Sequence, residues 1–171
     1  KSIIISSKKK DKRVNFKKSI EIDFLKNQLN FLIDFKKIRP SVLRIFYITI
    51  NPKIFLRKNL FYATKNGGKK LEYFSLNNNG DFNHGDRVNN IVSAKNCLGA
   101  TDGKIIIGDK IKYLEINLDR SFSAIMPMIQ YKKIKNNYLL RIFFSASETD
   151  DTYKSSFKNI KAKISLKLKK F

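Results

Sequence analysis

The sequence has a single cysteine, Cys97, and no tryptophan among its 171 residues. One cysteine excludes an internal disulfide and any cysteine-rich zinc site. The chain also has few glycines (7) and prolines (3), which excludes a low-complexity sequence. No apolar run approaches the ~18 residues that a membrane-spanning helix needs, so we expect no membrane span.

Acidic residues are scarce as well. There are 14 Asp and Glu against 36 Lys and Arg, which gives a formal net charge of +22. The like-charged side chains of such a chain repel one another in the compact state. This net charge is commonly tolerated where an anionic partner screens it. The sign favours nucleic acid, an anionic membrane surface or a polyanionic glycan, and compositional drift is the alternative explanation.

What the chain does have is apolar residues in a strand-like pattern. Hydrophobic residues make up 42% of the sequence, enough for the core of one domain. Residues 14–24 and 29–35 alternate apolar and polar side chains, which predicts a hairpin of two strands that each bury one face. A helix over residues 21–37 is the alternative there. The clearest alternation is in residues 160–171, where apolar residues alternate with lysines.

Turn residues separate the other apolar segments at short intervals. Three further hairpins are predicted around Asn66-Gly67-Gly68, Gly108-Asp109 and Lys135-Asn136-Asn137. Short strands without long helical patterns predict an all-β fold, namely an antiparallel β-sandwich or barrel, jelly-roll-like, with short basic tails. We assign residues 1–13 to a basic N-terminal arm and residues 14–171 to a single β-sandwich domain.

The only histidine, His84, lies between Asp81 and Asp86 in the segment LNNNGDFNHGDRVNN. A zinc site would need a further histidine or cysteine, and an EF-hand calcium loop would need a glycine and a terminal glutamate at other positions. Asn and Gly are ordinary turn residues. A long hairpin loop is therefore the main interpretation, with Asp81, His84 and Asp86 as weak candidates for metal ligands, and no cofactor is predicted.

The run YFSLNNNGDFNHGDR, residues 73–87, followed by LEINLD, residues 114–119, resembles the TerD-type calcium-binding β-sandwich family. The resemblance covers under a third of the chain and implies a sandwich that binds calcium. The paired acidic ligands of that family are missing between the two segments, where Asp102 and Asp109 stand singly. No ligand position is therefore carried over.

A second acidic cluster, Glu148, Asp150 and Asp151, lies in SASETDDTY. A glycosidase uses a pair of carboxylates, but these three are nearly adjacent in a polar segment, which is typical of a solvated loop; a local cation site is the alternative. The sequence shows no glycine-rich phosphate loop and no serine nucleophile motif. We therefore expect a protein that is not an enzyme.

The lysines follow a pattern that suits contact with a phosphate backbone. Four lysines of the last strand project to one side, Lys8 to Lys10 lie in the N-terminal arm, and lysine pairs recur along the rest of the chain. Lysine rather than arginine favours shape-tolerant phosphate contact over base reading, while protection of a sheet edge is the alternative role. The predicted nucleic-acid-binding residues are Lys8, Lys9, Lys10, Lys12, Arg13, Lys161, Lys163, Lys167 and Lys169.

The sequence thus predicts a non-enzymatic, basic structural or binding subunit that contacts nucleic acid, RNA above DNA, beside other proteins of an assembly. A ribosomal or other ribonucleoprotein component and a nucleic-acid-packaging coat protein both fit, in an intracellular or organellar location. The alternative is an accessory β-sandwich domain of a carbohydrate-acting or calcium-binding protein. That alternative predicts an aromatic-lined groove or a bound calcium ion in place of a uniformly positive face.

Overall fold

The computed structural model describes residues 1–10, 15–38, 43–65, 68–76, 97–122, 124–147 and 158–171. These residues form an eight-stranded and a four-stranded sheet, and every strand pair in both sheets is antiparallel. The larger sheet has the spatial order β1 (Ser2–Lys10), β2 (Asn15–Asp23), β3 (Gln28–Ile38), β12 (Lys158–Lys170), β9 (Lys112–Leu118), β8 (Lys104–Gly108), β5 (Phe61–Thr64) and β6 (Glu72–Ser75). The smaller sheet has the order β4 (Leu43–Ile50), β11 (Asn137–Ser147), β10 (Met126–Ile134) and β7 (Cys97–Gly99).

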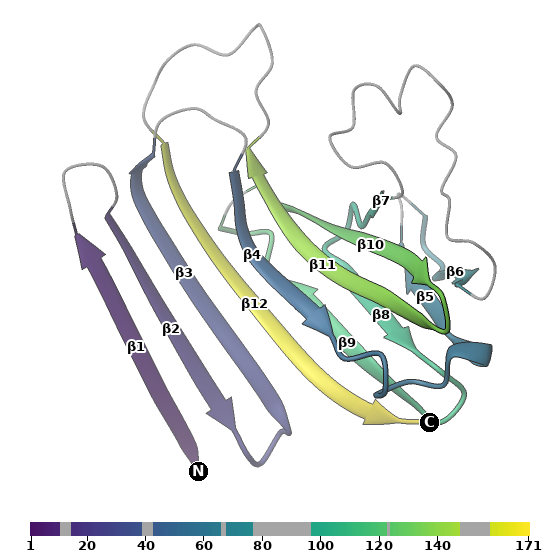
Figure 1. The fold of residues 1–171 in the computed structure, drawn as a ribbon. Helices are drawn as coiled ribbons and strands as arrows, with labels where there is room; N and C mark the ends of the chain where they lie inside the picture. The colour runs from purple at the N-terminus through teal and green to yellow at the C-terminus, as the bar shows by residue number, and fades with distance from the viewer. Residues whose placement is uncertain (11–14, 39–42, 66–67, 77–96, 123, 148–157) are drawn as a thin grey trace, which may run out of the picture.

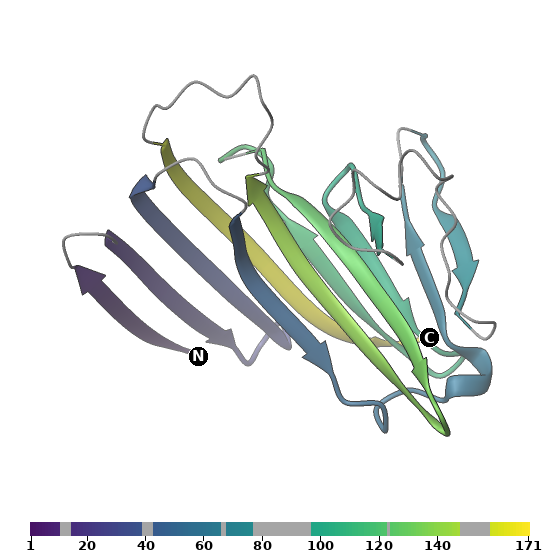
Figure 2. The same ribbon diagram turned by 45° about the horizontal axis from the view of Figure 1, so that its top comes forward.

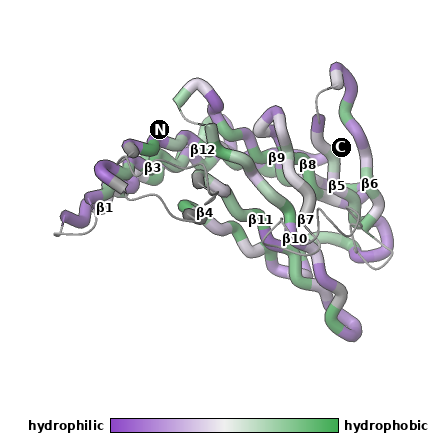
Figure 3. The backbone as a smooth tube through the Cα atoms, turned by 90° about the horizontal axis from the view of Figure 1, so that it is seen from above, coloured by the Kyte–Doolittle hydropathy of each residue, from purple (hydrophilic) through white to green (hydrophobic). Residues whose placement is uncertain are grey.

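The smaller sheet is stacked on one face of the larger one (Figures 1 and 2). The predicted all-β antiparallel sandwich is therefore confirmed, with two open sheets rather than a closed barrel. Seen from above, β1 lies past the edge of the smaller sheet (Figure 3). The larger sheet thus has one face that the smaller sheet covers in part and one face that points away from it.

Alternation along β12 explains how the two faces differ. Ile160, Ala162 and Ile164 are buried against the smaller sheet, while Lys161 and Lys163 between them are exposed on the other side. Because successive side chains of a strand point to opposite faces, the same division holds for the neighbouring strands in register. The core between the sheets includes buried residues from both, among them Ile33, Ile107, Ile116, Ile129, Leu140, Ile142 and Phe144.

The hairpin predicted near the N-terminus is confirmed, and the alternative helix over residues 21–37 is wrong. Strands β2 and β3 pair from Asn15↔Lys36 to Asp23↔Gln28. The Asp23 carboxylate accepts hydrogen bonds from the backbone N–H groups of Leu25 and Lys26, both at 3.1 Å. A side chain that satisfies backbone donors in this way stabilises a tight turn.

The hairpins predicted around residues 66–68, 108–109 and 135–137 are confirmed as β5–β6, β8–β9 and β10–β11. A 3-10 helix, Arg57–Asn59, precedes β5. No helix in the described part of the chain is long and apolar enough to cross a membrane.

Part of the predicted N-terminal arm is a strand of the sheet. Ser2–Lys10 form β1, which pairs with β2 along its whole length, from Ser2↔Asp23 to Lys10↔Asn15. All nine residues of β1 are exposed, so backbone pairing rather than side-chain burial holds this strand in place. The predicted boundary at residue 13 lies outside the described residues.

Candidate functional site

The face of the larger sheet that points away from the smaller sheet, here called the outer face, is polar at its centre. Ser165 of β12 lies opposite Asn30 of β3 on one side and Asn117 of β9 on the other. Directly opposite residues share one face of a sheet, so these three side chains project together. Segments far apart in the sequence therefore contribute to one polar surface.

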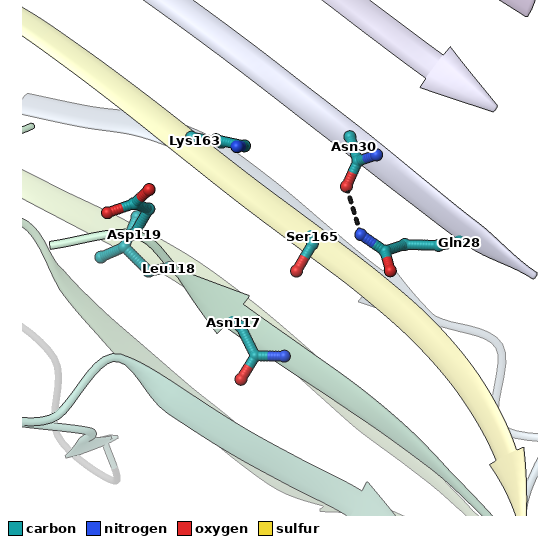
Figure 4. A pocket seen from close by; sticks show the side chains of 7 residues that line it. All are labelled: Gln28, Asn30, Asn117, Leu118, Asp119, Lys163 and Ser165. Atoms are coloured by element: carbon teal, nitrogen blue, oxygen red, sulfur yellow. Dashed lines mark hydrogen bonds between the residues drawn. The ribbon is translucent and has the colours of Figure 1, made fainter. Parts of the chain in front are cut away.

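An open cavity of about 260 Å³ lies over these residues (Figure 4). Gln28 donates a hydrogen bond from Nε2 to Asn30 Oδ1 at 2.6 Å, and Asn30 donates from Nδ2 to Glu21 Oε2 at 3.1 Å. Each amide offers further donor and acceptor positions beyond those used here. The cavity is lined by Gln28, Asn30, Asn117, Leu118, Asp119, Lys163 and Ser165.

Glu115 of β9 links the cavity to two lysines. Lys169 donates from Nζ to Glu115 Oε2 at 2.9 Å, and Lys104 Nζ lies 3.5 Å from the same oxygen. Asn117 donates from Nδ2 to Glu115 Oε1 at 3.2 Å. Burial raises the pKa of Glu115, but the hydrogen bonds from Lys169 and Asn117 and the charges of both lysines outweigh it, so that the pKa lies below its ordinary value. Glu115 is therefore a charged acceptor at neutral pH.

We expect Glu115→Gln to reduce the free energy of unfolding by about 1 kcal/mol at pH 7, because a charge-assisted hydrogen bond becomes a neutral one. A depressed pKa stabilises the fold above the ordinary pKa of glutamate, and this contribution is lost as pH falls through the depressed value. Urea denaturation at pH 7 and pH 3 should therefore show a difference between variant and wild type that shrinks in acid. The exposed Glu72 of β6 provides the control, since Glu72→Gln should change little at either pH. A difference that does not depend on pH would contradict this account of Glu115.

Beside Glu115 the outer face becomes aromatic. Four rings from β5, β6, β9 and the C-terminal residue form what we call the aromatic ridge: Phe61, Tyr73, Tyr113 and Phe171. Ring centroids are 5.8 Å apart for Phe61–Tyr73, 6.1 Å for Phe61–Phe171 and 4.8 Å for Tyr113–Phe171. Tyr73 and Phe171 are 66% and 74% exposed. The ridge is thus an apolar, aromatic surface that a ligand can reach.

The β8–β9 turn fixes the backbone that directly precedes Tyr113 of the aromatic ridge. A Cβ atom at Gly108 would overlap the carbonyl oxygen of Lys112 and the Cβ of Tyr113, so only glycine allows the strands to approach here. The adjacent Asp109 is fully buried, and its Oδ1 accepts hydrogen bonds from the N–H groups of Ile111 and Lys112 at 2.8 and 3.0 Å. Its Oδ2 accepts from the N–H of Leu56 at 2.7 Å. Asp109 thereby ties the turn that precedes Tyr113 to the segment that precedes β5.

A further ring lies beside Lys161, two residues before the cavity-lining Lys163 on β12. Phe122 is exposed, and Lys161 Nζ lies 4.7 Å from its ring centroid. Nearby, Asp119 accepts hydrogen bonds from the hydroxyl and the N–H of Ser121 at 2.6 and 3.1 Å, which hold the pKa of Asp119 below its ordinary value. Along β12 the order is thus Phe122 beside Lys161, then the polar cavity at Ser165, then the aromatic ridge beside Lys169.

The lysines predicted to contact phosphates do not form a uniformly positive strip. Lys161 lies opposite Asp34, Lys167 lies opposite Glu115, and Lys169 is bonded to Glu115. In β1, Lys9 points to the face opposite that of its two neighbours, because adjacent residues of a strand alternate. The residues that share the outer face are Lys8, Lys10, Lys161, Lys163, Lys167 and Lys169. Lys12 and Arg13 lie outside the described residues.

The predicted metal candidates Asp81, His84 and Asp86 also lie outside the described residues, and so does the acidic cluster at residues 148–151. Within the residues that are described, no group of three or more His, Cys, Asp or Glu side chains is placed to hold a metal ion. Of the two segments that resemble the TerD-type family, residues 114–118 belong to β9, and residues 77–87 are not described.

Comparisons with known proteins give a likeness among solved structures. No protein-family model matches the chain, and no curated protein matches it in sequence. Among solved structures, the chain is similar to a protein from Escherichia coli K12 described as a putative aldose 1-epimerase, with 8% sequence identity and a TM-score of 0.47. The match covers 99% of this chain and 66% of that protein, so this chain spans less than two thirds of its length.

The prediction of a nucleic-acid-contacting subunit is wrong, and the physical reason is in the charges of the outer face itself. Carboxylates from β3 and β9 lie opposite lysines of β12, which lowers the positive potential that a phosphate backbone requires.

Apart from Lys163, sequence reasoning missed the residues that line the cavity and their neighbours on β9. Tyr113, Glu115 and Asn117 alternate with apolar residues in KYLEINL, which marks them as one face of a strand. This alternation does not show which residues of other strands lie beside them. The strand pairing shows it, because Asn117 lies opposite Ser165, and Ser165 lies opposite Asn30. Only the strand order brings these residues together.

Proposed function

We propose that this chain is a carbohydrate-binding β-sandwich domain that holds an oligosaccharide on its outer face, and that it acts by binding rather than by catalysis. The observation that carries the proposal is the cavity of amide, hydroxyl and carboxylate groups on the outer face, with aromatic rings further along the same strands in both directions. This is the carbohydrate-acting alternative of the sequence analysis, which predicted an aromatic-lined groove or a bound calcium ion.

The chemistry of a sugar ring matches these two kinds of surface. Its hydroxyl groups both donate and accept hydrogen bonds, as do the side-chain amides of Gln28, Asn30 and Asn117 and the hydroxyl of Ser165. Its C–H faces are apolar and pack against aromatic rings such as those of Tyr113 and Phe171. Lys169 is four residue steps after Ser165 along β12, which corresponds to ~13 Å at the usual rise of a strand. That distance suits a short oligosaccharide lying along the strand.

The charge state of the carboxylates supports a binding role. A glycoside hydrolase needs one carboxyl group with a raised pKa to act as a general acid. Glu115 and Asp119, the carboxylates beside the cavity, both have lowered pKa values, because Lys169 and Ser121 donate hydrogen bonds to them. Both are thus charged at neutral pH and suited to accept hydrogen bonds from sugar hydroxyls.

A panel of immobilised hexasaccharides of glucose, xylose, N-acetylglucosamine and galacturonic acid tests the proposal. We expect at least one of them to bind, and Asn117→Ala to weaken that binding about tenfold, because removing one hydrogen-bonding partner costs about 1.4 kcal/mol. Asn136→Ala, in the exposed β10–β11 turn, is the matched control and should bind as the wild type does. Absence of binding across the panel, or equal loss in both variants, would contradict the proposal.

A further inference from the structure

The strand β1 at the edge of the larger sheet is unusually open to a partner. Within the described residues its one neighbour in the sheet is β2. Ile3, Ile4 and Ile5 are 50%, 67% and 58% exposed, although isoleucine is among the residues most often buried. A long edge strand that exposes apolar residues is a ready template for pairing with another chain.

The hydrogen-bonding pattern shows which backbone groups of β1 face outward. The N–H of Phe24 donates to the carbonyl of Lys1, and the register continues as Ile3↔Ile22 and Ile5↔Ile20. In an antiparallel ladder every second pair is hydrogen-bonded, so the odd residues of β1 bond to β2. The N–H and C=O groups of the even residues therefore point away from β2, toward the open edge.

The side chains of β1 divide the edge into an apolar half and a basic half. Ile3 to Ile5 occupy the first half, and Lys8 to Lys10 occupy the second. On the outer face, Ile4 is followed by Lys8 and Lys10. On the other face, Ile3 and Ile5 continue an apolar surface with Ile20, Ile22 and Leu29, their neighbours in register on β2 and β3.

The smaller sheet leaves this apolar surface partly open. Its strand β4 reaches β3, where Phe31 and Phe46 pack with ring centroids 4.7 Å apart, and Lys18 Nζ of β2 lies 5.0 Å from the Phe46 ring. Toward the β2–β3 turn, Leu29 and Phe24 are exposed. In Figure 3, β1 lies beyond β4 at the end of the sandwich. An added strand would extend the sheet there and shield Ile3 and Ile5.

We propose that β1 binds an extended segment of another protein as an added antiparallel strand, with acidic residues opposite Lys8 and Lys10 and apolar β-branched residues opposite Ile3 to Ile5. This is recognition by strand addition, in which backbone hydrogen bonds give affinity and alternate side chains give specificity. Charge complementarity selects this occupant over a second copy of the chain. Each copy carries a net charge of +22, which opposes self-association.

The orientation fixes the order of residues in the partner. All strand pairs of this sheet are antiparallel, so we expect the partner strand to run in the direction opposite to β1. Its acidic residues come first, and its apolar residues follow. The peptide Glu-Ser-Glu-Thr-Thr-Val-Val-Val places glutamates opposite Lys10 and Lys8 and valines opposite the three isoleucines.

Fluorescence anisotropy with this labelled peptide at low salt tests the pairing. We expect binding that is at least tenfold tighter than that of Lys-Ser-Lys-Thr-Thr-Val-Val-Val, and that weakens with added salt because the contacts are exposed charges. The reversed peptide, Val-Val-Val-Thr-Thr-Glu-Ser-Glu, should also bind at least tenfold more weakly. Equal binding of the lysine peptide would overturn the charge complementarity, and equal binding of the reversed peptide would overturn the antiparallel orientation.

A proline substitution tests the backbone contacts without breaking the sheet. The N–H of Ser6 points to the open edge, where proline is tolerated in a sheet. Ser6→Pro should therefore weaken peptide binding at least tenfold and leave the thermal unfolding midpoint nearly unchanged, while Ser6→Ala should bind as the wild type does. Full binding by folded Ser6→Pro would overturn the proposal, and so would a wild-type dimer in sedimentation that Ser6→Pro dissociates, since a second copy would then occupy the edge.

Discussion

Replacement of Asp109 by alanine is expected to reduce the free energy of unfolding by about 4 kcal/mol, the largest effect on stability that we predict for a single substitution. The carboxylate is fully buried and accepts three hydrogen bonds from backbone N–H groups, those of Leu56, Ile111 and Lys112. Alanine would remove three hydrogen bonds between partly buried donors and a charged acceptor, and each such bond is worth about 1.5–3 kcal/mol.

Urea denaturation of Asp109→Ala and Asp109→Asn measures this effect. Asparagine keeps one acceptor oxygen, so its loss should be smaller than that of alanine. Asp102→Ala is the matched control, because Asp102 also accepts a hydrogen bond from a backbone N–H, that of Lys104 at 3.1 Å, but in an exposed turn. Its effect should be below about 1 kcal/mol.

The same residue makes stability depend on pH. Burial raises the pKa of Asp109, but the hydrogen bonds from Leu56, Lys112 and Ile111 outweigh it and lower the pKa. A lowered pKa contributes stability that is present above the ordinary pKa of aspartate and lost as pH falls through the lowered value. In Asp109→Ala the free energy of unfolding should therefore fall less steeply as the pH is lowered than it does in the wild type. Equal losses in Asp109→Ala and Asp102→Ala, with the pH dependence of the wild type, would show that Asp109 does not hold the turn.

The second large effect concerns the aromatic ridge. If sugar rings pack on Tyr113 and Phe171, the double variant Tyr113→Ala, Phe171→Ala should weaken oligosaccharide binding about a hundredfold, because removing central aromatic contacts of an interface costs about 3 kcal/mol. Tyr113 and Phe171 have ring centroids 4.8 Å apart and lie beside Glu115 and Lys169. Both rings thus lie on the same face of the sheet as the polar cavity, beyond the residues that line it.

Isothermal titration with the hexasaccharide that binds best would measure the loss. Tyr47→Ala is the matched control: Tyr47 is an exposed tyrosine with a ring partner, Phe143, at 6.3 Å, but it lies on β4 of the smaller sheet. That variant should bind as the wild type does. Equal affinities in the ridge variant and the wild type, with both folded by circular dichroism, would remove the ridge from the binding site.

Much of the fold could be predicted from the sequence because it depends on local patterns. Alternation identified residues 160–171 and the first hairpin, and turn residues such as Gly108 and Asp109 marked the strand ends. The strand β1 could not be predicted in this way. Its residues SIIISSKKK do not alternate, and all of them are exposed, so its place depends on backbone pairing with β2.

The outer face depends on pairing between distant segments, which local sequence patterns do not show. Asn30, Asn117 and Ser165 meet because β12 lies between β3 and β9. The same pairing explains why the phosphate-binding prediction was wrong. The sequence of β12 alone predicts a row of lysines on one face. The carboxylates of Asp34 and Glu115, which lie opposite two of these lysines, come from β3 and β9.

The central claim, that the outer face of the larger sheet binds an oligosaccharide, is tested most directly by mapping the site in solution. Backbone amide NMR shifts followed during titration with the hexasaccharide panel would report each residue separately. We predict that the largest shifts lie at Asn30, Asn117 and Ser165 around the cavity and at Tyr113 on the aromatic ridge. Saturable shifts confined to the smaller sheet, or no shifts with any of the four sugars, would contradict the claim.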